Sequence, residues 1–273
     1  MPPSARLALM GTLELRGRDG LVALPASSQR LLAFAALRHK PLARGYVAGH
    51  LWLDSTEQRA AANLRSALWR LHRAAGDVVW ASGRELGLAR WVEVDMHHAT
   101  AAAHQVLAGR GRVPAELAAT LIASDDVLPD WYDEWIDTER ERFRQIRLHA
   151  LERLCERLTV ERRFGEALQA GLAALRTEPL RESAHRVMIG MHLAEGNLGE
   201  AVRQYEACER LLSSQLGVRP ARQTSKLIDD GMSARNGRRR RARSTWRRAR
   251  QPAARRRAGR APRPRRDPDR RAS

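Results

Sequence analysis

One stretch of this sequence carries hydrogen-bonding side chains at helical spacing with no acid among them. Between residues 55 and 75 these side chains are Arg59, Asn63, Ser66, Arg70 and Arg73. At 100° per residue they share a stripe about 80° wide. Guanidinium, amide and hydroxyl groups can hydrogen-bond base edges and phosphates in a DNA major groove. Charge alone favours an ordinary solvated surface helix, so the neighbouring elements must decide between the two interpretations.

The same stretch has the other marks of an amphipathic helix. Ser55 and Gln58 have the spacing of a capping box, and Gly76 suits the position just after a helix end. An apolar arc opposes the stripe and predicts a buried face; it consists of Ala60, Leu64, Ala67, Leu68 and Leu71.

The flanking sequence predicts a winged helix-turn-helix over residues 1–95. Alternating leucines over 7–15 predict a small antiparallel sheet. Ser27 or Ser28 can cap a helix that runs to about His39, and a shorter helix is expected over 44–51. After Gly76, strands over 78–80 and 85–89 flank a turn at 82–84. Arg84, at the tip of that hairpin, either reaches the DNA backbone or minor groove or is simply an exposed turn residue.

Residues 96–224 carry helix signals only, and part of them repeats. The segment 163–168 (RFGEAL) returns as 197–202 (NLGEAV), and Ala150 returns as Ala184, both at an offset of 34 residues. That is the period of tetratricopeptide (TPR) helix pairs, which stack into arrays that bind other proteins. A plain helical bundle is the alternative. The predicted fold is mainly α with a small β component.

The net charge of +18 is concentrated in the last part of the chain. Residues 235–273 hold 18 arginines and two aspartates (+16), whereas residues 1–95 carry +5 and residues 96–234 carry −3. With almost no aliphatic side chains, an Arg-rich tail over 225–273 is expected to be disordered. It would bind polyanions without sequence preference.

We find no pattern for catalysis, for a metal site or for a cofactor. The sequence has no Gly-rich phosphate loop, and Cys155 and Cys208 lack the spacing of zinc ligands, which favours buried thiols in a reducing cytosol. His97, His98 and His104 are expected at the domain junction, and the acids of 125–137 on a solvated helix face. No apolar run approaches the length of a membrane span and no signal peptide is evident, so we expect a cytoplasmic protein that is not an enzyme.

These segments resemble the Streptomyces antibiotic regulatory proteins (SARPs), which join an OmpR-type winged helix to a bacterial transcriptional activator domain (BTAD). The resemblance covers residues 5–221. It rests above all on ANLRSALWRL and on EPLRESAHRVMI followed by EGNLGEAVRQYE. Gly45 and Gly49 depart from the family, since they weaken the second helix by up to about 1 kcal/mol each. The match also stops near Arg222, and a frameshift in GC-rich coding sequence is one hypothesis for the tail.

The resemblance implies a transcriptional activator of secondary-metabolite genes, located with the nucleoid. It would bind direct repeats in promoter DNA, as a homodimer on the DNA, and contact RNA polymerase or itself through the helical domain. By position, the recognition helix includes Arg65, at the flank of the stripe, which we assign to phosphate. Two alternatives remain. One is a TPR-like protein-interaction scaffold without specific DNA binding, and the other is a polyanion binder that acts through the tail.

Overall fold

The N-terminal domain is built on a four-stranded sheet with the order β3-β2-β1-β7. β1 (Ala5–Ala8) pairs antiparallel with β2 (Glu14–Gly17), which pairs with β3 (Gly20–Leu21), and β7 (Val92–Val94) lies parallel to β1. Leu7 and Leu15 are register partners and both are buried, as the alternating leucines predicted. The computed structural model describes residues 5–38 and 40–249.

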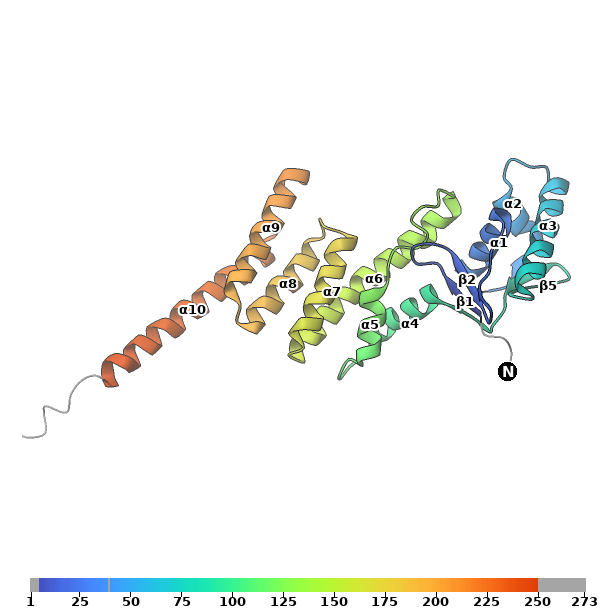
Figure 1. The fold of residues 1–273 in the computed structure, drawn as a ribbon. Coiled ribbons are helices and arrows are strands. Elements are labelled where there is room, and N and C mark those ends of the chain that lie inside the picture. Colours follow the sequence, from blue (N-terminus) through green and yellow to red (C-terminus); the bar gives the residue numbers. More distant parts are fainter. Residues whose placement is uncertain (1–4, 39, 250–273) are drawn as a thin grey trace, which may run out of the picture.

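Three helices and a hairpin complete a winged helix-turn-helix (Figure 1). The helices are α1 (Ala26–Leu37), α2 (Arg44–Leu51) and α3 (Glu57–Ala75). The hairpin of β5 (Val79–Ser82) and β6 (Glu85–Leu88) pairs through β6 with the short β4 (Leu42–Ala43). The predicted order of sheet, helices and hairpin is therefore confirmed.

Both predicted helix caps are wrong. α3 is capped by the Thr56 hydroxyl, which accepts from the backbone N–H of Arg59, whereas Ser55 lies in a turn in which its N–H donates to the Trp52 carbonyl. α1 has Pro25 at its N-cap and no side-chain cap. Ser28 is instead buried in the first turn, where its hydroxyl donates to the Ala67 carbonyl of α3 at 3.2 Å.

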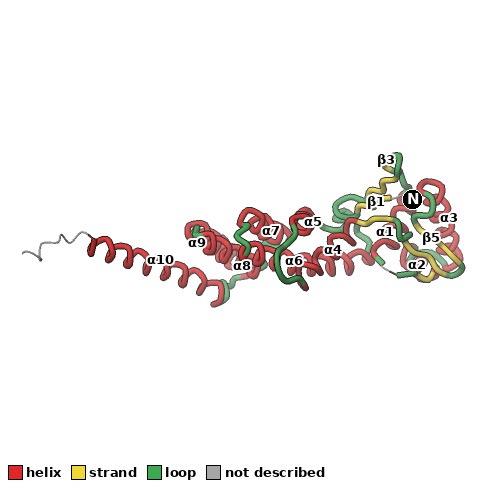
Figure 2. The backbone as a smooth tube through the Cα atoms, turned by 90° about the horizontal axis from the view of Figure 1, so that it is seen from below, coloured by secondary structure: helices red, strands yellow, loops and turns green. Residues whose placement is uncertain are grey.

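Within the described residues, the regular elements of the second domain are helices, and Val127 forms an isolated β-bridge with Met10. The domain comprises α4 (Asp95–Ala108), α5 (Ala115–Ala123), α6 (Glu134–Val160), α7 (Phe164–Thr177), α8 (Glu182–Glu195) and α9 (Leu198–Leu216). α6 packs on α7 and α8 packs on α9, forming two successive helix pairs. α7 and α9 begin 34 residues apart, and Ala150 and Ala184 are both fully buried, as the repeat predicted. The pairs follow one another away from the winged helix (Figure 2).

α10 (Arg222–Ala249) corrects the expectation that the chain is disordered from residue 225. Its first turns are not purely basic. Thr224 and Ile228 are buried, and α10 contacts both α8 and α9. Arg and Ala are also good helix formers, which favours continuation of the helix into the basic segment. The remainder of the predicted tail, 250–273, lies outside the described residues.

The core of the winged helix extends into the second domain, whose later helices have a core of their own. Phe34 of α1 meets Trp135 of α6 edge to face, with ring centroids 4.9 Å apart. The backbone N–H of Gly11 donates to the Asp126 carbonyl at 2.8 Å, and that of Leu128 donates to the Leu9 carbonyl at 2.9 Å. The winged helix is therefore packed against the start of α6 and does not hang from a free linker.

Most acids of 125–137 are exposed, as expected, but those from Asp125 to Asp133 do not lie on a helix. Residues 128–133 precede α6 and are not helical, and Tyr132 is 92% exposed. Asp133 forms an ion pair with Arg30 of α1, while Glu139 forms one with Arg38 at 2.5 Å. His97 lies at the junction as expected, with its Nε2 2.7 Å from the Ala36 carbonyl oxygen.

Candidate nucleic-acid interface

The buried face of α3 fixes the orientation of the predicted stripe. Ala60, Leu64, Ala67 and Leu71 are nearly inaccessible and belong to the core of the winged helix. The bond from Ser28 to Ala67 ties this face to α1. Rotation of α3 about its own axis would expose these apolar groups, so the opposite side is held toward solvent.

The structure places the predicted stripe on that outer side. Arg59, Asn63, Ser66, Arg70 and Arg73 are all exposed. The Arg70 Nε donates to the Ser66 carbonyl at 3.2 Å, which leaves the rest of its guanidinium free to point outward. Arg65 is exposed as well and lies at the flank, where the sequence placed it. We call the exposed side of α3 that carries these six side chains the α3 face.

Trp69 belongs to the α3 face and was missed by the sequence reasoning. It is 61% exposed, and the Arg73 guanidinium carbon lies 5.4 Å from the ring centroid. This cation–π contact limits the freedom of both side chains before any ligand is present. The helical angle could have revealed Trp69, because one-turn spacing from Ser66 and Arg73 excludes it from the apolar arc.

Arg84 lies apart from α3, at the tip of the β5–β6 hairpin. Gly83 precedes it with φ of 54°, which gives the tight turn a left-handed residue at low cost. The Arg84 carbonyl accepts from the N–H of Arg44 at 2.8 Å, so its backbone is held against the start of α2. The Arg84 side chain is exposed. β5 contacts α3, so the hairpin lies beside the helix.

Groups suited to metal or thiol chemistry do not gather elsewhere in the described structure. Residues 5–38 and 40–249 contain no cluster of three or more His, Cys, Asp or Glu side chains that could hold a metal ion. Burial raises the pKa of Cys155 to about 12 and that of Cys208 to about 11. Both thiols are therefore protonated at neutral pH. Over the same residues, none of the helices combines the length and apolar character of a membrane span.

The family model of the bacterial transcriptional activator domain matches residues 93–230. The chain belongs to that family. The match confirms the SARP resemblance, and it identifies this BTAD protein as a transcriptional regulator of the SARP type. The matched segment begins within β7 and ends within α10, so it includes the part of α10 that packs on α8 and α9.

A solved structure has the same fold. Mycobacterium tuberculosis EmbR, determined in complex with a low-affinity phosphopeptide, superposes with a TM-score of 0.65 at 18% sequence identity. The match covers 85% of this BTAD protein and 66% of the EmbR chain. This likeness shows the fold alone. No curated protein sequence matches the chain.

Proposed function

We propose that this BTAD regulator binds double-stranded DNA sequence-specifically through the α3 face. The observation that carries the proposal is a set of exposed hydrogen-bond donors on α3 with no acidic side chain among them. The opposite side of the helix is buried in the core, which fixes the direction in which these donors point. Arg side chains read guanine and Asn reads adenine through paired hydrogen bonds. The ring of Trp69 adds an apolar surface of the kind that meets a thymine methyl.

The remaining contacts are assigned to the DNA backbone. Arg65 flanks the α3 face and Arg84 projects from the neighbouring hairpin, which is the place of the wing in a winged helix. Contacts to phosphate position a protein on the duplex without reading its sequence. We therefore expect loss of Arg84 to weaken binding to all sequences equally.

Family membership supports the finer features of the proposal. We infer an activator of secondary-metabolite genes that acts in the cytoplasm at the nucleoid and binds direct repeats as a homodimer on the DNA. The helical domain then contacts RNA polymerase or a second copy of the chain. The stacked pairs α6–α7 and α8–α9 offer the extended surface that such contacts need.

DNase footprinting upstream of the gene and its neighbours tests the proposal. The protein is truncated to residues 1–234, which keeps the buried contacts of Thr224 and Ile228 but removes the 18 arginines that would bind any DNA. We expect protection of paired repeats about 10–11 bp apart, one turn of the duplex.

Variants on the α3 face show whether that face makes the footprint. Asn63→Ala combined with Arg70→Ala should weaken specific binding at least about 30-fold, since each base contact contributes about 1–3 kcal/mol. Trp69→Ala should weaken it too, whereas Arg153→Ala, an exposed change on α6, should have no effect. If the truncated protein protects nothing while the full chain shifts any DNA, the tail binds and the α3 face is idle. If neither binds, the chain is an interaction scaffold.

A further inference from the structure

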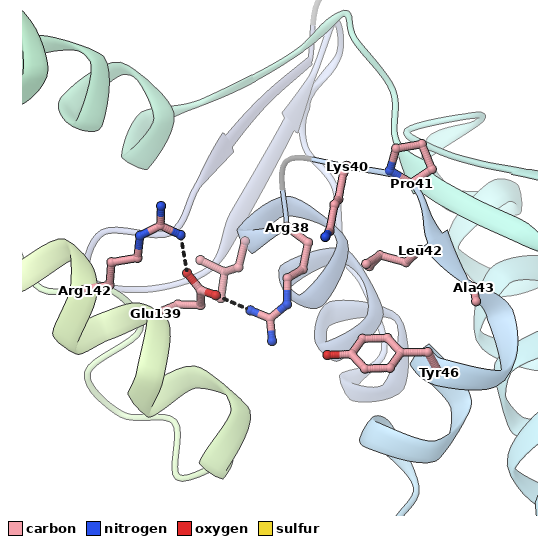
Figure 3. Close-up of a pocket in the computed structure, with 9 residues that line it drawn as sticks. Arg38, Lys40, Pro41, Leu42, Ala43, Tyr46, Glu139 and Arg142 are labelled. Carbon is pink, nitrogen blue, oxygen red and sulfur yellow. Dashed lines mark hydrogen bonds and ion pairs between the residues drawn. The ribbon is translucent and has the colours of Figure 1, made fainter.

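A cleft of about 820 Å³ lies where the winged helix meets α6. On the winged-helix side it is lined by the last residues of α1, by residues 40–43 and by the first turn of α2, and on the opposite side by α6 (Figure 3). The lining residues are Leu37, Arg38, Lys40, Pro41, Leu42, Ala43, Tyr46, Glu139 and Arg142. This volume is in the range of small-molecule sites, which often lie between domains.

The polar side chains of this junction cleft carry a net charge of +2. Arg38, Lys40 and Arg142 face a single carboxylate, Glu139. Arg38 holds that carboxylate at 2.5 Å, whereas Arg142 approaches it only to 3.9 Å and has an 80% exposed side chain. Lys40 forms no ion pair with any side chain that the structure describes. Two cations are therefore available to an incoming anion.

The rest of the lining is apolar and includes an aromatic ring. Leu37, Pro41 and Leu42 form the apolar wall, and Tyr46 is 44% exposed. The Tyr46 ring is braced from within the winged helix by His50, with centroids 4.0 Å apart, and by Phe34, at 6.0 Å. In Figure 3, Tyr46 extends from α2 toward the Arg38–Glu139 pair. A flat ring could therefore bind beside the cations.

We propose that the junction cleft binds a small phosphate monoester that carries a flat ring. A phosphate monoester bears about −1.5 to −2 charges at pH 7, which matches the net positive charge of the cleft. A carboxylate would neutralise only half of that charge. Arg142 and Lys40 supply charge-assisted hydrogen bonds to the phosphate oxygens. A DNA backbone phosphate fits less well, because these groups line a recess between two domains.

The ligand would act on a contact that joins the domains. Its phosphate competes with Glu139 for Arg142 and adds negative charge beside the Arg38–Glu139 pair. That pair holds the end of α1 to α6. Ligand binding would therefore change the ion pairing at the contact between the winged helix and α6.

Isothermal titration of the full chain with phenyl phosphate tests the site. Phenyl sulfate (one charge), inorganic phosphate (no ring) and phenol (no charge) serve as matched probes at constant ionic strength. We expect phenyl phosphate to bind most tightly. Lys40→Gln and Arg142→Gln should each weaken it about tenfold or more, the usual scale for a hydrogen bond to a charged group. Both residues are exposed, so neither change threatens folding.

Arg153→Gln is the control, because it removes an exposed arginine from the same helix outside the cleft. Every variant retains the basic tail, so weak binding of the probes to the tail is the same in this control and in the cleft variants. The proposal is overturned if phenyl phosphate binds no better than phenyl sulfate, or if Arg153→Gln weakens binding as much as Arg142→Gln. It is overturned as well if the cleft variants lose affinity only for random-sequence duplex DNA, which would make the cleft a backbone contact.

Discussion

Gly171 sets how closely the two helix pairs of the BTAD approach each other. It lies on α7, and a Cβ added there would stand 2.1 Å from the Met188 Sδ of α8 and 3.5 Å from the Cys155 Sγ of α6. Carbon and sulfur cannot approach to 2.1 Å, and Met188 is 1% exposed, so its sulfur has no route to solvent. Gly171→Ala must therefore push α7 and α8 apart or force Met188 out of its rotamer.

Two opposing terms decide the size of the effect. Alanine is favoured over glycine inside a helix by about 1 kcal/mol. Overpacking a filled core costs about 1–3 kcal/mol, and a contact this short belongs at the upper end. We expect a net loss of about 1–2 kcal/mol, or roughly 2–8 °C in Tm at this chain length. Gly190→Ala in α8 is the matched control, since an added Cβ there meets nothing within 4 Å and only the helix preference remains.

Urea unfolding followed by far-UV circular dichroism measures both variants. Gly171→Ala should lower the midpoint and Gly190→Ala should raise it. In a Met188→Ala background the clash is gone, so Gly171→Ala should become neutral or stabilising, a coupling of about 1–3 kcal/mol. A Gly171→Ala midpoint equal to or above that of the wild type would refute the close packing of α7 on α8.

Two further predictions concern buried polar groups. Cys155 and Cys208 are fully buried and their pKa values are raised to about 12 and about 11, so neither thiol should react with Ellman's reagent at pH 8 until the protein is unfolded. A thiol in the unfolded chain ionises near pH ~8.5, whereas the folded thiols keep their protons. The free energy of unfolding should therefore not depend on these thiols below that pH and should fall as the pH rises toward 12. Cys155→Val should reduce that fall, and rapid labelling of the native protein would contradict the burial. Arg147→Met should lower the free energy of unfolding by about 1–3 kcal/mol, because it leaves the buried carbonyl and hydroxyl of Ser124 without their donor; an unchanged urea midpoint would show that these bonds contribute nothing.

Local patterns were sufficient to predict most of the elements and the exposed polar side of α3. The helical period placed Arg59, Asn63 and Arg70 on an exposed face because the opposing residues were uniformly small or aliphatic. The 34-residue offset predicted the start of α9 from that of α7. These features depend on neighbours within one or two turns, or on exact repetition, and both can be read from a single sequence.

Features that depend on tertiary contacts could not be predicted in this way. Ser28 has the residue type of a helix cap, yet its hydroxyl bonds to another helix. Asp133 reads as part of a solvated acidic face, but its partner, Arg30, lies about 100 residues earlier in the chain. The pairing of Glu139 with Arg38 spans a similar distance and has no local signal either. The start of α10 reads as the beginning of a polar tail, and only the packing of Thr224 and Ile228 shows that it continues the helical array.

The extension of the winged-helix core into the start of α6 limits how the domains can be exchanged between relatives. A chimera cut after residue 95 would separate Phe34 from Trp135 and break the backbone hydrogen bond from Leu128 to Leu9. The transplanted winged helix would then present a bare apolar surface, prone to aggregation. The portable unit is therefore larger than the winged helix, because it includes α4, the segment before α6 and the first turns of α6. The proposed role of the α3 face is therefore better tested by substitutions on α3 than by exchanging whole domains.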